Sequence, residues 1–105
     1  MDMIRKPLKV RSKAIRQAAR GKPCTLRLPG CMGGTETTVL AHLPMGGKGV
    51  GTKGSDIWAV FACASCHDVL DGRKAGQCTA EDMMRALYKT LHRLIEDEIV
   101  EVRDV

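Results

Sequence analysis

The residues best suited to chemistry lie between Cys63 and Asp71, where two thiols, an imidazole and two carboxylates occur within nine residues. Cys63 and Cys66 have the Cys-x-x-Cys spacing of a structural zinc site. His67 and Asp71 are four residues apart, which on a helix places both side chains on one face. This stretch therefore predicts two kinds of metal site, one of thiolates and one of imidazole and carboxylate.

The thiolate site needs two more ligands, which Cys24 and Cys31 can supply. A Pro-Gly turn within residues 23–31 predicts a β-hairpin that brings these two thiols together. Zinc prefers tetrahedral coordination by thiolate or imidazole, so the four cysteines predict a structural zinc ion. The alternative is two pairs of free thiols. Cys78, the fifth cysteine, is expected to be a free thiol.

A general base is predicted at His42. Residues 37–42 are rich in β-branched and apolar residues, which predicts a strand that ends at this histidine. Imidazole is suited to proton abstraction near neutral pH, although a lone histidine is more often structural. Asp56 is expected to orient a group or to join a metal shell. The pair His67 and Asp71 can hold a divalent cation with open water positions, whereas His92 has no such partners and is interpreted as structural.

Two predicted helices flank this set. Ser12 can cap a short helix through about Arg20, with a glycine as its stop. Thr79 and Asp82 form a capping-box start for a helix over residues 80–96. The expected apolar stripe of that helix is Met84, Leu87, Leu91, Leu94 and Ile95, and its expected ion pair is Glu81–Arg85.

The segments between the helices are read from their composition. Residues 56–62 run apolar into the cysteine pair, and a further helix is expected from about residue 64. The glycine-rich residues 45–55 do not match a phosphate-binding P-loop, because Thr52 stands where a Lys-Ser/Thr pair is required, so they predict a surface loop. The acidic tail after residue 97 predicts a short strand or no regular structure.

Length and composition indicate one small α+β domain. A chain of 105 residues with one Trp, one Tyr and one Phe has a weak core that a metal can support. We expect a basic arm and helix over residues 1–22, a zinc-binding core over 23–76 and a C-terminal helix over 79–97. No apolar run approaches the length of about 18 residues that a membrane span needs, and no signal-peptide pattern is present. A cytoplasmic location with reduced thiols is therefore expected.

The net charge of +5 is concentrated in the N-terminal part of the chain. Residues 1–30 hold nine Lys/Arg and one acid, whereas residues 79–105 hold four Lys/Arg and seven acids. This asymmetry favours nucleic acid over a membrane as the partner. The alternative is a solvated charged face. The residues predicted to contact phosphates are Lys13, Arg16, Arg20, Lys22, Arg27, Lys48 and Lys53.

Four longer motifs resemble a known family. Residues Lys22–Cys24, Pro29–Cys31, Glu36–His42 and Cys66–Arg73 look like segments of small phage and prophage proteins that are regarded as candidate nucleases. That family is of the HNH (ββα-metal, treble-clef) endonuclease type and is related to the phage Rap (NinG) recombination endonucleases. The resemblance covers most of residues 12–75.

The resemblance implies a β-hairpin and a following helix that hold one catalytic Mg²⁺ or Mn²⁺, with a separate zinc ion maintaining the fold. His42 matches the base that activates water, and Asp56 stands in for the middle Asn of the HNH motif. His67 matches the first metal ligand on the helix, and Asp71 stands where many relatives have His. Ala41 is a departure, because relatives often carry a metal ligand at that position.

The implied function is a metal-dependent DNA endonuclease that hydrolyses phosphodiester bonds in double-stranded or branched DNA. It would act in phage recombination or DNA processing in a bacterial host, and its DNA binding should weaken steeply with salt. One alternative is a non-catalytic zinc module that binds DNA or a protein, which Ala41 favours. The other is an interaction protein whose amphipathic C-terminal helix forms a homodimer.

Overall fold

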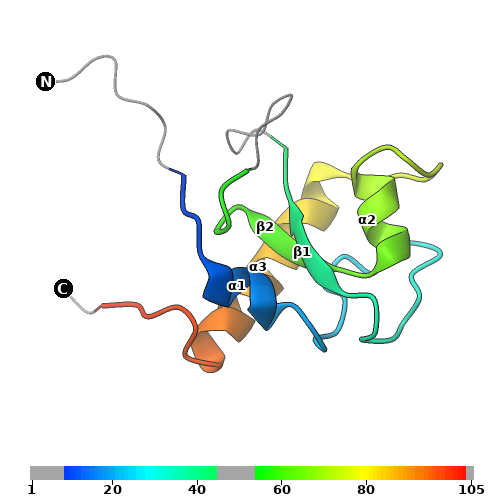
Figure 1. Ribbon diagram of the computed structural model, residues 1–105. Helices are drawn as coiled ribbons and strands as arrows, with labels where there is room; N and C mark the ends of the chain where they lie inside the picture. Colours follow the sequence, from blue (N-terminus) through cyan, green and yellow to red (C-terminus); the bar gives the residue numbers. More distant parts are fainter. Residues whose placement is uncertain (1–8, 45–53, 104–105) are drawn as a thin grey trace, which may run out of the picture.

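The computed structural model describes residues 9–44 and 54–103 (Figure 1). It is a small α+β fold with one two-stranded sheet, as the sequence predicted. Within these residues no helix is both long enough and apolar enough to cross a membrane. In chain order the elements are α1 Lys13–Ala18, β1 Val39–His42, β2 Ala59–Ala62, α2 Ala64–Leu70 and α3 Ala80–Glu96.

The antiparallel pair β1–β2 separates two small apolar clusters. In this pair Leu40 lies opposite Phe61 and Ala41 lies opposite Val60. Ala41 and Val60 pack into the cluster that contains the buried cysteines, whereas Leu40 and Phe61 pack with residues of α1 and α3. Because neighbouring side chains of a strand point to opposite faces, His42 projects from the face of Leu40, away from the cysteines.

The outer edge of β2 is closed by two threonines. The Phe61 carbonyl accepts hydrogen bonds from the Thr25 backbone N–H at 2.7 Å and from the Thr25 hydroxyl at 2.9 Å. The Phe61 N–H donates to the hydroxyl of Thr90, which is fully buried in α3, and the two hydroxyls are 2.9 Å apart. These bonds attach α3, which passes behind the strands in Figure 1, and the segment before Cys31 to the sheet.

Residues 23–31 do not form the β-hairpin that the sequence predicted. The segment contains no strand and turns instead at Arg27, with φ +47°, and at Gly30, with φ +87°. Prolines at positions 23 and 29 lack the N–H groups that a hairpin ladder uses, which accounts for the difference. Leu26 and Leu28 are both buried, so the segment is anchored by its apolar side chains.

Helix α1 is shorter than expected and α3 has the predicted bounds. Ser12 caps α1 by accepting a hydrogen bond from Ile15 N–H at 3.2 Å, but the helix ends at Ala18. In α3 both bonds of the predicted capping box between Thr79 and Asp82 are present, and these bonds explain why α3 starts at Ala80.

Two side-chain predictions for α3 are wrong. Met84 is 70% exposed, because the buried positions of the helix are Ala86, Thr90 and Leu94, which repeat every four residues. Arg85 pairs with Asp82 at 2.8 Å, one turn away at i,i+3, in place of the expected i,i+4 partner. Leu87, Leu91 and Leu94 of the predicted stripe pack against the core, whereas Met84 and Ile95 are exposed.

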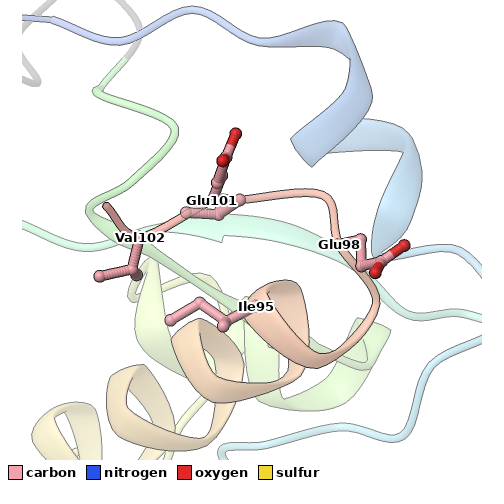
Figure 2. A pocket seen from close by; sticks show the side chains of 5 residues that line it. Ile95, Glu98, Glu101 and Val102 are labelled. Carbon is pink, nitrogen blue, oxygen red and sulfur yellow. The ribbon is translucent and has the colours of Figure 1, made fainter. Parts of the chain in front are cut away.

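The chain after α3 forms a Schellman turn in place of a strand over its described residues. Ile99 N–H donates to Leu94 O at 2.9 Å and Glu98 N–H donates to Ile95 O at 3.0 Å, with Glu98 in the left-handed region at φ +59°. Figure 2 shows Glu101 and Val102 lying over the end of the helix beside Ile95, where they line a shallow pocket. Glycine is favoured at the position of Glu98, since an L side chain is strained there.

Glu98→Gly is expected to raise the free energy of unfolding by about 1 kcal/mol, because it removes the left-handed strain while keeping the turn. Urea denaturation followed by circular dichroism measures the change. Glu96→Gly, inside the helix, is the matched control and should lower stability by about 1 kcal/mol. Equal losses for both variants would contradict the assignment of a strained turn.

Candidate functional site

Four cysteines come together in one cluster. The Sγ atoms of Cys24, Cys31, Cys63 and Cys66 all lie within 4.8 Å of one another, and those of Cys31 and Cys63 are 3.8 Å apart. Sulfurs bound to zinc at about 2.3 Å in a tetrahedron lie about 3.8 Å from each other, so the donor set and its spacing fit this ion. The four residues can therefore hold a metal ion such as zinc, and Cys78, half-buried against the same cluster, is not among them.

The cysteines are presented by the junction of β2 and α2 and by the turn before Cys31. Cys63 is the N-cap of α2, and its sulfur accepts a hydrogen bond from Cys66 N–H at 3.5 Å. The next backbone N–H, of Ala64, donates to the Thr37 hydroxyl at 3.0 Å. The start of α2 is thus fixed from both sides, which places Cys63 and Cys66 one turn apart and facing inward.

The pKa values of Cys31, Cys63 and Cys66 are shifted in different directions. Burial opposes ionisation of Cys63, but hydrogen bonds from the backbone N–H groups of Met32 and Cys66 lower its pKa to about 7. Burial raises the pKa of Cys66 and of Cys31, and each is further raised by the neighbouring cysteines. Metal binding requires thiolates, so the cluster releases protons when it takes up an ion.

A second site contains His42 and Asp56. His42 Nε2 lies 2.8 Å from Asp56 Oδ1, and the side chain of Asp56 is completely buried. The carboxylate also accepts hydrogen bonds from Ser12 N–H and from the Arg16 guanidinium, each at 2.7 Å, and from the Arg11 guanidinium at 3.2 Å. Asp56 therefore fixes the histidine ring from inside the protein and is not exposed to a substrate.

Asp56 is ionised in this environment. Burial alone would raise its pKa, but the hydrogen bonds from His42, Ser12 and Arg16 and the charge of Arg11 together lower the pKa below its ordinary value. With the carboxylate accepting from Nε2–H, the lone pair of a neutral His42 ring is on Nδ1. This arrangement fixes the orientation and the tautomer of a neutral ring.

His67 and Asp71 face each other on α2. His67 Nε2 lies 3.0 Å from Asp71 Oδ2, and the Arg73 guanidinium lies 3.3 Å from the same oxygen. The i,i+4 relation on one helix face is as the sequence predicted. In residues 9–44 and 54–103 the four cysteines form the one group of three or more metal-ligating side chains, so neither His67 nor Asp71 joins His42 and Asp56 in such a group.

Of the residues predicted to contact phosphates, some are exposed and others are already paired with an acid. Lys13, Arg20 and Arg27 are exposed, whereas Lys22 pairs with Asp97 at 3.1 Å and Arg16 is bound to Asp56. Lys48 and Lys53 lie outside the described residues. His92, interpreted from the sequence as structural, lies against Tyr88 with ring centroids 4.2 Å apart and the ring planes tilted by 40°.

Arg11 was missed by the sequence reasoning. It contacts Asp56, which is 45 residues away in the chain, so no local spacing indicates the pair. The sequence signal that could have indicated a carboxylate partner for Arg11 is the excess of Lys and Arg over acids in the N-terminal segment.

The fold and the cysteine cluster define a small α+β protein with four clustered thiols that could hold a metal ion. The family model described as "Putative nuclease YbcO" matches residues 13–98, so this chain belongs to that family. It is similar to the protein "Putative nuclease YbcO" of Escherichia coli (strain K12), with 45% identity over 80 residues that cover 68% of this chain and 83% of the relative. The protein of Enterobacteria phage 82 described as "Putative nuclease ybcO" has the same identity and coverage.

A solved structure shares the fold. It is described as "Structure of a putative bacteriophage protein from Escherichia coli str. K-12 substr. MG1655". The TM-score is 0.65 at 32% sequence identity, and the match covers 81% of this chain and 100% of the other. The chain is therefore related to phage and Escherichia coli proteins that are described as putative nucleases, as the motifs predicted.

Removal of the metal is expected to unfold the domain around the cysteines. Purified protein should contain one zinc ion per chain, measured by atomic emission, and a strong chelator should abolish much of the helical circular dichroism. Cys66→Ser should lose the zinc and the helicity. Cys78→Ser is the matched control and should retain both. Unchanged helicity after complete zinc removal would contradict a structural role for the ion.

Asp56→Asn is expected to lower the free energy of unfolding at pH 7 by about 2–3 kcal/mol, because it weakens charged hydrogen bonds to a buried acceptor. Since the pKa of Asp56 is lowered by folding, its contribution is present above the unfolded value of about 3.9 and is lost as pH falls through the folded value. Urea denaturation at pH 7 and pH 3 measures both. A variant as acid-sensitive as the wild type would contradict this account.

Proposed function

We propose that this chain is an HNH-type endonuclease that hydrolyses phosphodiester bonds of DNA. The observation that carries the proposal is His42, which stands at the end of β1 with its ring held by the buried carboxylate of Asp56. The order β1, β2, α2, with the four cysteines gathered around the start of α2, also supports an HNH-like ββα unit. Membership of a family described as nucleases supports the reaction class.

In the proposed reaction His42 is the general base. Its Nδ1 takes a proton from a water molecule, and the water oxygen forms a bond to phosphorus while the bond from phosphorus to the leaving oxygen breaks. The leaving oxygen then takes up a proton. Asp56 acts as a positioning residue, because it holds Nε2–H and so keeps the ring in the tautomer that can accept at Nδ1.

His67 and Asp71 are the residues that we propose as ligands of a divalent cation. One imidazole nitrogen and one carboxylate oxygen leave several positions for water and a substrate phosphate, a donor set that suits Mg²⁺ or Mn²⁺. When bound, such an ion would stabilise negative charge on the phosphate. Arg73, 3.3 Å from Asp71, would have to give up this contact.

In this proposal the exposed cations of the N-terminal half bind the DNA. Lys13, Arg20 and Arg27 are exposed and therefore available to phosphates, with Lys48 and Lys53 as further candidates outside the described residues. Double-stranded or branched DNA in the cytoplasm of a bacterial host is the proposed substrate, and the similarity to proteins of Escherichia coli and phage 82 supports this setting.

A second candidate function is a non-catalytic zinc module that binds DNA or a protein. The observation favouring it is Ala41, which is fully buried in the apolar cluster where HNH relatives are expected to carry a metal ligand. This candidate predicts nucleic-acid binding without cleavage in any divalent cation.

Cleavage of plasmid and branched DNA should require His42. His42→Ala is expected to lower the rate by about 10²- to 10⁴-fold, because the proton acceptor is lost. The assay compares Mg²⁺, Mn²⁺ and no added divalent cation, with zinc content checked in each sample.

Met84→Ala is the matched control, since this exposed residue on α3 should not affect the rate. Full activity of His42→Ala would overturn the role of His42. Tight DNA binding with no cleavage in either cation would favour the non-catalytic module.

A further inference from the structure

We propose that a groove between α3 and Pro23 binds an unpaired nucleobase of a polynucleotide and its adjoining phosphate. The inference rests on the proposed nuclease function and names a feature of its substrate, namely unpaired nucleotides. The groove has a volume of about 320 Å³, within the size range of small-ligand sites. Tyr88, Lys89, His92 and Arg93 of α3 line it.

An aromatic pair on the surface of α3 forms one side of the groove. Tyr88 is 63% exposed, and its ring lies 4.2 Å from that of His92, centroid to centroid, at an interplanar angle of 40°. The buried positions of α3 are Ala86, Thr90 and Leu94, so neither ring is needed for the packing of the helix. A fixed and accessible aromatic ring is the platform on which single-stranded nucleic acids stack their bases.

The bottom of the groove is buried and its polar groups are already hydrogen-bonded. Phe61 is 1% exposed and lies there with Thr25. The Thr25 hydroxyl is shared between Phe61 O and Thr90 Oγ1, each at 2.9 Å. A ligand therefore contacts an apolar surface at the bottom of the groove and finds its polar partners on the rim. Such a site suits a flat heterocycle with a charged group attached.

The charged residues on the rim favour a phosphate. Lys89 forms no ion pair within the part of the chain that the structure describes. Arg93 and Lys22 share one carboxylate, Asp97, at 3.0 and 3.1 Å, so one positive charge of this trio is not neutralised. Against them the groove is lined by one acid, Glu96. An aromatic ring beside excess positive charge is complementary to a nucleotide.

Only a nucleobase that lies outside a double helix can enter the groove. Bases of an intact duplex are stacked on each other and paired, so their faces cannot reach Tyr88. Single strands and the unpaired nucleotides at branches or gaps expose these faces. We therefore infer that the protein prefers DNA with unpaired nucleotides to a continuous duplex.

Binding measurements on the full chain test the inference without cleavage. Fluorescence anisotropy would compare a labelled oligo(dT) single strand with a blunt duplex of the same length, using zinc-loaded His42→Ala protein. Tyr88→Ala should weaken single-strand binding by about 5- to 150-fold, the range for loss of one stacked base. Duplex binding should change less than twofold.

Three further variants make the result specific. Tyr88→Phe keeps the ring and should bind within about twofold of the parent protein. Met84→Ala, an exposed residue one turn earlier on α3, is the matched control and should have no effect. Lys89→Ala should weaken binding and lower the slope of affinity against salt by about one counterion.

Unchanged single-strand binding by Tyr88→Ala, or an equal loss for duplex, would overturn the inference. The outcomes also separate this proposal from the nuclease function. Tyr88-dependent binding without any cleavage by wild-type protein would retain the groove and reject the nuclease. Cleavage by wild-type protein with Tyr88-independent binding would do the reverse.

Discussion

The convergence of four cysteines joins two segments of the chain that lie far apart in the sequence. Cys24 and Cys31 come from an irregular segment, and Cys63 and Cys66 from the start of α2, yet their sulfurs lie within 4.8 Å of one another. Neither the segment 23–31, which contains no strand, nor the seven-residue helix α2 is long enough to be stable alone. A metal ion bound by all four thiolates would stabilise both at once, because it adds coordinate bonds to the apolar contacts of this cluster.

Asp56 has a comparable role on the other face of the hairpin. It joins Ser12, the N-cap of α1, and Arg16, in the last turn of α1, to His42 at the end of β1, so the N-terminal segment and the candidate base are held by one carboxylate. The two centres use different physics. The cysteines depend on a bound cation, whereas Asp56 depends on guanidinium groups supplied by the chain itself. Because Arg16 is used in this way, the positive surface available to DNA is smaller than the formal charge of α1 suggests.

Local features of the sequence were sufficient for α3, for the strand that ends at His42 and for the identity of the four cysteines. The capping box at Thr79 and the Cys-x-x-Cys spacing are both short-range signals. Long-range contacts were not predictable in this way. The sequence predicted Met84 and not Thr90 on the buried face of α3. The contacts that bury Thr90 are with Phe61 and Thr25, which are 29 and 65 residues away in the chain. The contacts of Asp56 with Arg11 and Arg16 and the irregular path of residues 23–31 depend likewise on tertiary packing that no periodicity reports.

The bonds that Phe61 makes to Thr25 and Thr90 also bear on self-association. A two-stranded sheet has two edges, and an unpaired edge is a template on which another chain can add a strand. On β2 both backbone groups of Phe61 are already occupied, one of them by a helical side chain. Intermolecular strand addition is therefore blocked at the middle of this edge, and a change of Thr90 to an apolar residue would expose an N–H group there and favour aggregation as well as instability.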